Sequence, residues 1–448
     1  MAVSSSAITP LALREGAIAP QLLRLAWPVL VVLVVQTAVG IAETWFVSSL
    51  GTAAIAGVAL VFPLFMLMAM MSNGGIGGGV SSAVARALGA GRRRDADAIA
   101  FHALAIALAF GAAFTLAAWL GGRALYAALG GRGEGLANAL LYSNFVFAAA
   151  IPAWITNLLA SALRGAGQVR VPARISIAGA AVTLVLSPAL IFGLGPFPAL
   201  GVAGAGVAMI VFNTAAAAAL ALYMRSGEAP VRLRLARLEY RHFADILRVG
   251  LLSAVGTLMV NVTVLLTTGL VGRFGRDAIA GFGLGSRLDY VLIPILFALG
   301  TASVTMVGIN VGAGQRARAR SIAWTAALIS VLATAAIGFA AALAPAAWIG
   351  LFSHEPAVLR DGTAYLQRVA PFYPFVGLGM ALYFAAQGAG SVMVPFLAGL
   401  LRLALVLGGG AAWVLALGGS LEGLFWFVAA GQVAFGAANA LATALKKP

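Results

Sequence analysis

The chain has 448 residues, of which 62% are hydrophobic and only 9% are charged. Soluble globular domains carry about 25% charged residues, so this composition excludes a soluble enzyme. The net charge is +15 and cysteine is absent, which leaves no disulfide framework and no thiolate metal site. In a chain this apolar, we first examine whether the positive charge reflects orientation in a membrane, and only then whether it reflects nucleic-acid binding.

Twelve apolar runs follow one another along the chain, each at least as long as the roughly 20 residues that a membrane-spanning helix needs. They lie at 22–47, 53–86, 96–120, 136–160, 171–193, 201–224, 243–271, 278–311, 320–345, 362–386, 392–417 and 421–445. Residues 1–20 are mixed polar and small, so we expect no removable signal peptide. The sequence predicts an all-α integral membrane protein with twelve transmembrane helices.

The only long polar break, 225–242, lies near the midpoint and divides the chain into two halves. We predict a cytoplasmic tail at 1–21, an N-terminal six-helix lobe at 22–224, a cytoplasmic inter-lobe loop at 225–242 and a C-terminal six-helix lobe at 243–445. Each lobe has an even number of helices, so both insert with the same orientation.

An internal repeat supports this division. SSLGTAAIAG at 48–57 aligns with GRFGRDAIAG at 272–281, ALGAGRRR at 87–94 with NVGAGQRA at 310–317, and GAGQVRVP at 165–172 with GAGSVMVP at 388–395. The offsets are 224, 223 and 223 residues, and chance similarity between Ala- and Gly-rich segments would not hold one register. The halves are therefore predicted to form a parallel repeat, as in transporters related by an axis along the membrane normal. The repeated GAG segments predict left-handed helix ends.

The distribution of basic residues predicts the orientation. With the N-terminus inside, the inner segments hold 19 arginines and lysines and the outer segments hold 6. Cytoplasmic loops of membrane proteins carry the excess of basic residues. Both termini are therefore expected in the cytoplasm, and most of the positive charge is explained without nucleic acid.

Several segments resemble the multidrug and toxic compound extrusion (MATE) family. The first run reads AWPVLVVLVVQTAVGIAETWFVSSLG at 26–51, the eighth SRLDYVLIPILFALGTASVTMVGINVGAG at 286–314, and the fifth is introduced by LRGAGQVRVP at 163–172. The resemblance extends from about residue 20 to 445. It implies a V-shaped pair of six-helix lobes around a central cavity that opens to alternate sides, with export driven by a proton or sodium gradient.

Two of the thirteen acidic residues, Glu43 and Asp289, lie inside the apolar runs and away from their starts. Asp97, Asp245 and Glu422 fall within the first three residues of their runs, where a carboxylate suits the helix dipole. An ionisable residue inside the membrane is costly and is a functional candidate by default. Glu43 lies about 7 Å from the outer end of the first helix, and burial there disfavours the ionised carboxylate, as a proton carrier requires. It also matches the family's first-helix carboxylate. Asp289 matches the acid of the family's eighth-helix pattern, here Arg287-Leu288-Asp289. The alternative for both residues is a structural ion pair.

The chain departs from the family at other ion-coupling positions. DinF-like members carry Asn and Asp in the fifth helix, where this chain has Thr183 and Ser187. NorM-like members carry Glu in the seventh helix and Asp in the tenth, where this chain has Asn261 and Val376. The sodium site of the NorM-like branch thus lacks both carboxylates. The resemblance is closer to the DinF-like branch and favours proton over sodium coupling, although hydroxyls and carbonyls can still complete a weak cation site with one carboxylate.

Further polar, aromatic and sulfur-containing side chains in the runs are candidates for lining the substrate cavity. They are Gln36, Phe62, Met66, Asn157, Asn261, Arg287 and Gln387. Polar side chains inside membrane helices also serve as interhelical hydrogen bonds, and apolar ones as lobe packing, so each has a structural alternative.

The sequence predicts a secondary active transporter of the bacterial cytoplasmic (inner) membrane rather than an enzyme. It would export amphipathic, cationic organic compounds by cation antiport, with H⁺ favoured and Na⁺ possible, with no cofactor and no metal, as a monomer in the lipid bilayer. The alternative is a lipid-linked saccharide flippase of the same superfamily, for which only Arg86, Arg287 and Arg402 are available within the runs.

Overall fold

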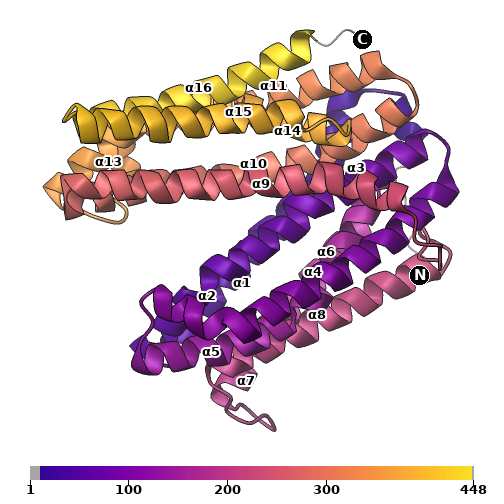
Figure 1. The fold of residues 1–448 in the computed structure, drawn as a ribbon, viewed down its shortest axis with the longest axis horizontal. Coiled ribbons are helices and arrows are strands. Elements are labelled where there is room, and N and C mark those ends of the chain that lie inside the picture. Colours follow the sequence, from indigo (N-terminus) through magenta and orange to yellow (C-terminus); the bar gives the residue numbers. More distant parts are fainter. Residues whose placement is uncertain (1–10, 446–448) are drawn as a thin grey trace. The chain divides into compact units, whose positions relative to one another are not determined.

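The computed structural model describes residues 11–445 of the chain, which form helices joined by short loops (Figure 1). No β-strand occurs within these residues. In the first half the helices are α1 (Ile18–Ser48), α2 (Thr52–Met70), α3 (Ile76–Gly89), α4 (Arg93–Ala128), α5 (Gly133–Ala148), α6 (Ala150–Gly165), α7 (Arg170–Phe192) and α8 (Val202–Arg225). A π-helical turn at Met71–Gly75 joins α2 to α3, so the two form one span.

The second half repeats this plan. Its helices are α9 (Tyr240–Val271), α10 (Arg276–Gly312), α11 (Arg316–Leu343), α12 (Pro345–Ile349), α13 (Pro356–Val369), α14 (Tyr373–Gly388), α15 (Met393–Leu403) and α16 (Leu421–Leu445). Two π-helical segments, Ala404–Gly409 and Ala412–Ala416, extend α15. Eleven helices in the described part are long and apolar enough to cross a membrane, and the bent pair α5 and α6 makes twelve. The predicted fold class is confirmed.

The fourth span is bent by 44° between α5 and α6. The break falls at Ala149, three residues before Pro152. Proline removes a backbone hydrogen bond and its ring crowds the preceding turn, which explains a bend just before this residue. Pro28, Pro63, Pro188 and Pro294 lie inside helices that continue past them.

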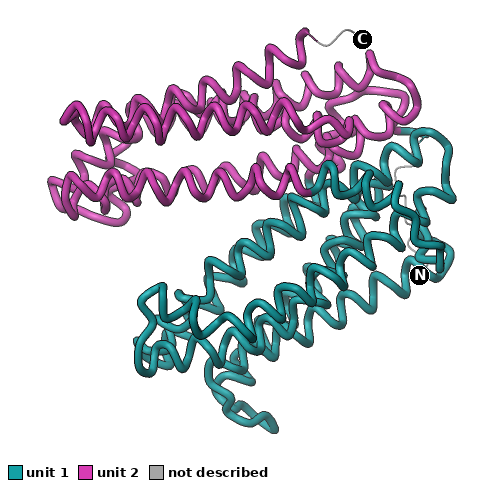
Figure 2. Tube along the Cα trace, in the orientation of Figure 1, with its two compact units in different colours: residues 1–12, 27–250 teal, residues 13–26, 251–448 magenta. Residues whose placement is uncertain are grey.

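The chain divides into two compact units (Figure 2). Of the described residues, the first unit contains 11–12 and Trp27–Gly250, and the second contains Leu13–Ala26 and 251–445. The segment at Leu13–Ala26 belongs to the second unit because Asn310 donates a hydrogen bond to the Leu13 carbonyl at 3.1 Å and Arg318 donates to Glu15 and Gly16. The predicted lobe bounds, 22–224 and 243–445, stay a prediction.

The repeat is visible in the backbone at the ends of helices. Gly91 and Gly314, which are 223 residues apart, adopt left-handed φ angles of 75° and 76°. In both places the following residue donates a hydrogen bond five residues back, Arg92 to Ala87 and Gln315 to Asn310. This is the Schellman helix ending that glycine favours. The second GAG pair, Gly167 and Gly390, ends α6 and α14 in the same way, with φ of 80° and 75°.

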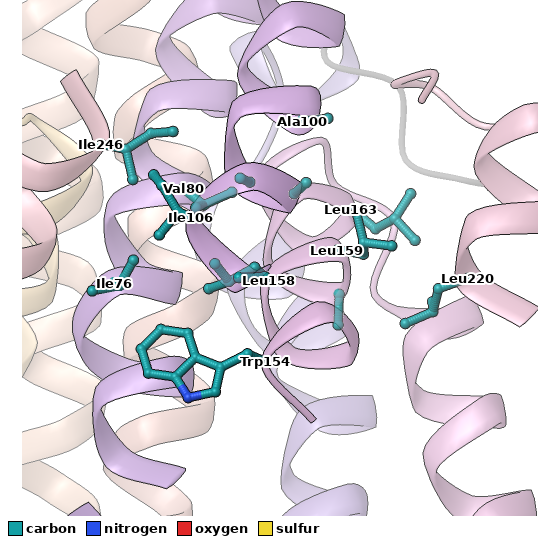
Figure 3. Packing of buried hydrophobic residues seen from close by; sticks show 14 of the residues in the cluster. Ile76, Val80, Ala100, Ile106, Trp154, Leu158, Leu159, Leu163, Leu220 and Ile246 are labelled. Atoms are coloured by element: carbon teal, nitrogen blue, oxygen red, sulfur yellow. The ribbon is translucent and has the colours of Figure 1, made fainter. Parts of the chain in front are cut away.

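Each unit has its own apolar core. In the first unit Trp154 is fully buried on α6 and stacks on Phe110 with 5.1 Å between ring centroids. It belongs to a cluster that also contains side chains of α3, α4 and α8 (Figure 3). In the second unit Tyr365 lies edge-on to both Phe282 and Phe425, at 5.2 Å from each. The second core includes Leu288 and Leu292 of α10, the helix that carries Asp289.

Candidate functional site: two carboxylates in the membrane spans

Glu43 lies near the end of α1, one helical turn before Val47. Val47 is buried in a small apolar cluster with Ile191 of α7 and Val202 of α8, and the adjacent Phe46 packs edge-on against Phe192. The Oε1 atom of Glu43 is buried and has no hydrogen-bond partner. This oxygen of the carboxylate is therefore removed from water without a hydrogen-bond donor.

Thr183 and Ser187 lie on the buried face of α7. Ser187 is one helical turn before Ile191, and Glu43 is one turn before Val47. Ile191 and Val47 belong to the same apolar cluster. Because α1 and α7 are the first and fifth spans, they cross the membrane in the same direction. Glu43 and Ser187 therefore lie one turn from the cluster on the same side. The Ser187 hydroxyl is also buried without a partner.

Tyr142 of α5 packs against the same cluster and lies close enough to Glu43 to interact with its charge. The surroundings of Glu43 are thus apolar side chains and hydroxyl groups. Buried polar atoms without partners are rare in folded proteins, and two of them occur together at this end of the first unit.

Asp289 lies on α10 in a more polar environment within the second unit. Its Oδ2 atom accepts a hydrogen bond from the Tyr365 hydroxyl of α13 at 3.1 Å, while Oδ1 is buried without a partner. Tyr373 of α14 is fully buried beside it, and the charge of Arg402 of α15 acts on the carboxylate. Four helices therefore converge on this aspartate.

Arg287 does not join that group. It is exposed, and its guanidinium lies 6.0 Å from the centre of the Phe352 ring. Residues two apart on a helix point in different directions, which is why the charged neighbour in the sequence is not the partner of Asp289 in the structure.

The other predicted site residues are spread over both units. Asn157 of α6 donates to Ser72 in the π-helical turn at 2.8 Å, and Gln387 of α14 donates to Ser253 of α9 at 2.9 Å. Asn261 donates to the carbonyl one turn back, at Thr257. Gln36 and Phe62 are exposed and Met66 is half-buried. Within the units these residues form separate hydrogen bonds and surfaces rather than one site.

The remaining acidic residues form ion pairs or hydrogen bonds, or are exposed to solvent. Asp245 pairs with Arg86, Asp95 with Arg92, and Glu422 with Arg368. Within residues 11–445, which include all thirteen acids, only Glu43 and Asp289 have a buried carboxylate oxygen without a hydrogen-bond partner. The same residues contain no group of three His, Asp or Glu side chains that could hold a metal ion.

Sequence reasoning missed the tyrosines of the Asp289 site. Tyr365 and Tyr373 lie in the tenth span, and a buried tyrosine hydroxyl usually has a polar partner, so two tyrosines in an apolar run were a usable signal. It also did not identify Arg164, which on α6 donates to Asn73 at 3.0 Å and to Ser161 at 2.7 Å.

The twelve spans, the repeat of the two halves and the ionisable groups inside the spans define a membrane transporter. The MatE family profile matches residues 28–189 and 253–408. The chain therefore belongs to the multidrug and toxic compound extrusion family, whose members are transporters and not enzymes.

Individual relatives cover most of the chain. It is 27% identical over 397 residues to the FAD transporter of Shewanella oneidensis, covering 86% of each chain. It is 28% identical over 430 residues to the probable multidrug resistance protein NorM of Pseudomonas putida, covering 92% of this chain and 90% of the relative. It also superimposes on the outward-facing conformation of a multidrug resistance MATE family transporter with a TM-score of 0.87 and 24% identity, covering 97% and 96% of the two chains.

Proposed function

We propose that this protein exports amphipathic, cationic organic compounds across the bacterial inner membrane in exchange for protons, with Glu43 as the proton carrier. The observation that carries the proposal is the buried Oε1 atom of Glu43, which has no hydrogen-bond partner. A charged carboxylate in such a place is costly, so two events can relieve the cost: uptake of a proton, or approach of a cation.

These two events exclude each other at one carboxylate, which is the basis of exchange. A cationic substrate is stabilised by ionised Glu43 and loses that stabilisation when Glu43 takes up a proton. A ligand shifts a conformational equilibrium only by its differential affinity for the two states. The proton and the substrate would therefore favour different arrangements of the first unit, and proton uptake from the outside would release the substrate there.

The composition of the site favours a proton over sodium. Hard cations are held by several oxygen ligands, among them carboxylates. Tyr142 lies near Glu43, and Thr183 and Ser187 are buried hydroxyls of α7. Asn261 and Val376 occupy positions where the NorM-like branch has acids. One carboxylate with hydroxyl neighbours is sufficient to carry a proton.

The test separates the two ions. The purified protein is reconstituted into liposomes, and the liposomes are loaded with ethidium. Ethidium efflux is then driven either by a pH gradient alone or by a sodium gradient alone. We expect efflux under the pH gradient only, and its loss in Glu43→Gln. Efflux under the sodium gradient alone, or unchanged pH-driven efflux in Glu43→Gln, would contradict the proposal.

The orientation, with both termini in the cytoplasm, is part of the proposal and rests on the 19 to 6 distribution of basic residues. The natural absence of cysteine allows a direct test. Arg234→Cys lies in the inter-lobe loop and Leu194→Cys in the loop after α7. In intact cells an impermeant maleimide should label Leu194→Cys and spare Arg234→Cys until the membrane is opened. The reverse pattern would overturn the orientation.

A second candidate is export of an anionic nucleotide. It is favoured by the similarity to a FAD transporter and by two arginines of the helices. Arg164 lies in the last turn of α6 in the first unit, and Arg402, whose Nε atom is buried without a partner, lies on α15 in the second. The same arginines would serve a flippase for a lipid-linked saccharide. FAD efflux that is lost in Arg164→Gln, with ethidium efflux absent, would favour this candidate over the first.

A further inference from the structure

The first unit has an apolar groove on the surface formed by α4, α6 and α8. Its volume is about 420 Å³, within the range of small-ligand sites. Leu104 of α4, Ile151 and Ile155 of α6, and Thr214 and Ala221 of α8 line it. Helix α6 packs against both other helices and forms the floor. Thr214 is the only lining residue with a polar side chain.

The groove has the depth of one leaflet of a bilayer. Thr214 lies eleven residues before the end of α8 at Arg225, and Leu104 lies eleven residues after the start of α4 at Arg93. At 1.5 Å per residue this is about 16 Å, while half of the hydrocarbon core is about 15 Å thick. The groove therefore runs from the interface on the side of the inter-lobe loop to about the centre of the membrane.

The inter-lobe loop covers the interfacial end of this groove. The backbone N–H of Leu233 donates to the Met224 carbonyl at the end of α8 at 3.1 Å, and the N–H of Arg232 donates to Asp97 of α4 at 2.7 Å. Farther along, the N–H of Glu239 donates to Nε2 of His102 of α4 at 2.8 Å. These bonds hold the loop across α4 and α8, and the Leu233 side chain lines the groove.

Cationic side chains gather at the same end. Arg225, Arg234 and Arg237 are exposed and have no ion-pair or hydrogen-bond partner within residues 11–445. Between them Leu235 and Leu238 are 90% and 60% exposed. Alternating exposed leucines and arginines suit the boundary between acyl chains and headgroups, where long basic side chains keep their charge at the interface.

We propose that this groove binds one acyl chain of an anionic phospholipid, whose headgroup is held by Arg225, Arg234 and Arg237. The apolar lining and the depth of one leaflet suit an acyl chain that enters the groove from the membrane interface. The free guanidinium groups select a negative headgroup, as basic pockets between membrane helices do. The bound lipid fastens the inter-lobe loop to the first unit, and the proposal does not depend on the exported compound or the coupling ion.

The first test measures headgroup preference. The purified full chain is titrated with phosphatidylglycerol or phosphatidylcholine of the same acyl chains, and bound lipid is counted by native mass spectrometry. We expect tighter binding of phosphatidylglycerol. The double variant Arg234→Gln with Arg237→Gln should weaken phosphatidylglycerol binding about 25-fold. This is about five-fold for each arginine, which corresponds to about 1 kcal/mol per basic residue near an anionic surface.

The matched control is Arg174→Gln with Arg316→Gln, which removes the same charge at exposed positions of α7 and α11. It should leave the preference unchanged. Equal affinity for the two lipids in the natural chain, or equal losses in the two double variants, would overturn the headgroup assignment.

The second test fills the groove. Ala218 lines it and Ala215 does not, although both are exposed on α8. We expect Ala218→Phe to abolish the tightly bound phosphatidylglycerol and the rise in melting temperature that this lipid causes, and Ala215→Phe to preserve both. Retention of the bound lipid in Ala218→Phe would overturn the groove as its site.

Discussion

The two carboxylates in the membrane spans differ in how their charge is compensated. Asp289 accepts a hydrogen bond from Tyr365 and lies near Tyr373 and Arg402. Glu43 has an apolar cluster on one side and no donor to its buried oxygen. A carboxylate with donors and a nearby cation can be a stable part of the fold, whereas one without them gains by changing its protonation state.

This difference suggests separate tasks within one repeated architecture. The first unit would carry the proton at Glu43, and the second would use Asp289 to hold α10, α13, α14 and α15 together and to present a charge to the substrate. Unsatisfied buried groups are expensive, so mutations at the two sites should separate transport from stability.

The largest effect is expected for Glu43→Gln. Transport driven by a pH gradient should fall to the level of empty liposomes, while the melting temperature in detergent stays the same or rises, because a neutral amide is less costly to bury than a charge. Resistance to toxic cations in an efflux-deficient host, with membrane expression checked by blotting, measures the loss. A Glu43→Asp variant should recover part of it. Resistance at the wild-type level in Glu43→Gln would show that Glu43 does not carry the proton, and the proposed difference in task between Glu43 and Asp289 would fail.

Asp289→Asn should affect both properties. The tyrosine donor and the arginine lose a charged partner, and a buried group left unsatisfied costs about 1–3 kcal/mol. We expect a clearly lower melting temperature and partial transport under the pH gradient. A variant as stable as the natural chain but without any transport would instead assign proton coupling to Asp289.

The tyrosines of the Asp289 site provide a matched pair. Tyr365→Phe removes a hydrogen bond worth about 1 kcal/mol and should lower the melting temperature. The buried Tyr373 hydroxyl lies near the same carboxylate but, unlike that of Tyr365, without the geometry of a full hydrogen bond, so Tyr373→Phe should lower the melting temperature less. Thermal unfolding of the two variants side by side measures the difference. Equal shifts in melting temperature would contradict the prediction that Tyr365 is bound to Asp289 more strongly than Tyr373.

The smallest change in stability is expected for Ser187→Ala. Its hydroxyl is fully buried without a partner, and replacing such a group with an apolar one is nearly neutral or stabilising. Transport should nevertheless slow, because Glu43 loses a hydroxyl neighbour. Thr115→Val is the control, since Thr115 donates to the Phe147 carbonyl at 2.6 Å and its loss should destabilise the first unit. Unchanged transport in Ser187→Ala would remove Ser187 from the coupling site.

Much of the fold was predictable because a bilayer imposes strict rules on a sequence. Every span has to satisfy its own backbone hydrogen bonds, so an apolar run of sufficient length becomes a helix. The predicted run 278–311 became α10 at Arg276–Gly312, and the glycines of the repeated GAG segments end helices with nearly equal φ angles. The same logic selected Glu43 and Asp289, since charge inside an apolar run stands out.

What the sequence could not provide is which side chains meet. Arg287 is two residues from Asp289 yet faces away. Tyr365, 76 residues along the chain, donates a hydrogen bond to the carboxylate, and the charge of Arg402, 113 residues along, acts on it. Similarly, only folding brings Leu233 of the inter-lobe loop to a groove between three helices.

The sequence by itself determined the number of spans, their order, the repeat and the two acids, because hydropathy and local backbone preferences act within a segment. Only the tertiary structure decided that Asp289 has partners and that the buried oxygen of Glu43 has none. Partners are chosen by the packing of helices distant in sequence, and neither spacing nor composition records the angle at which one helix presents a side chain to another.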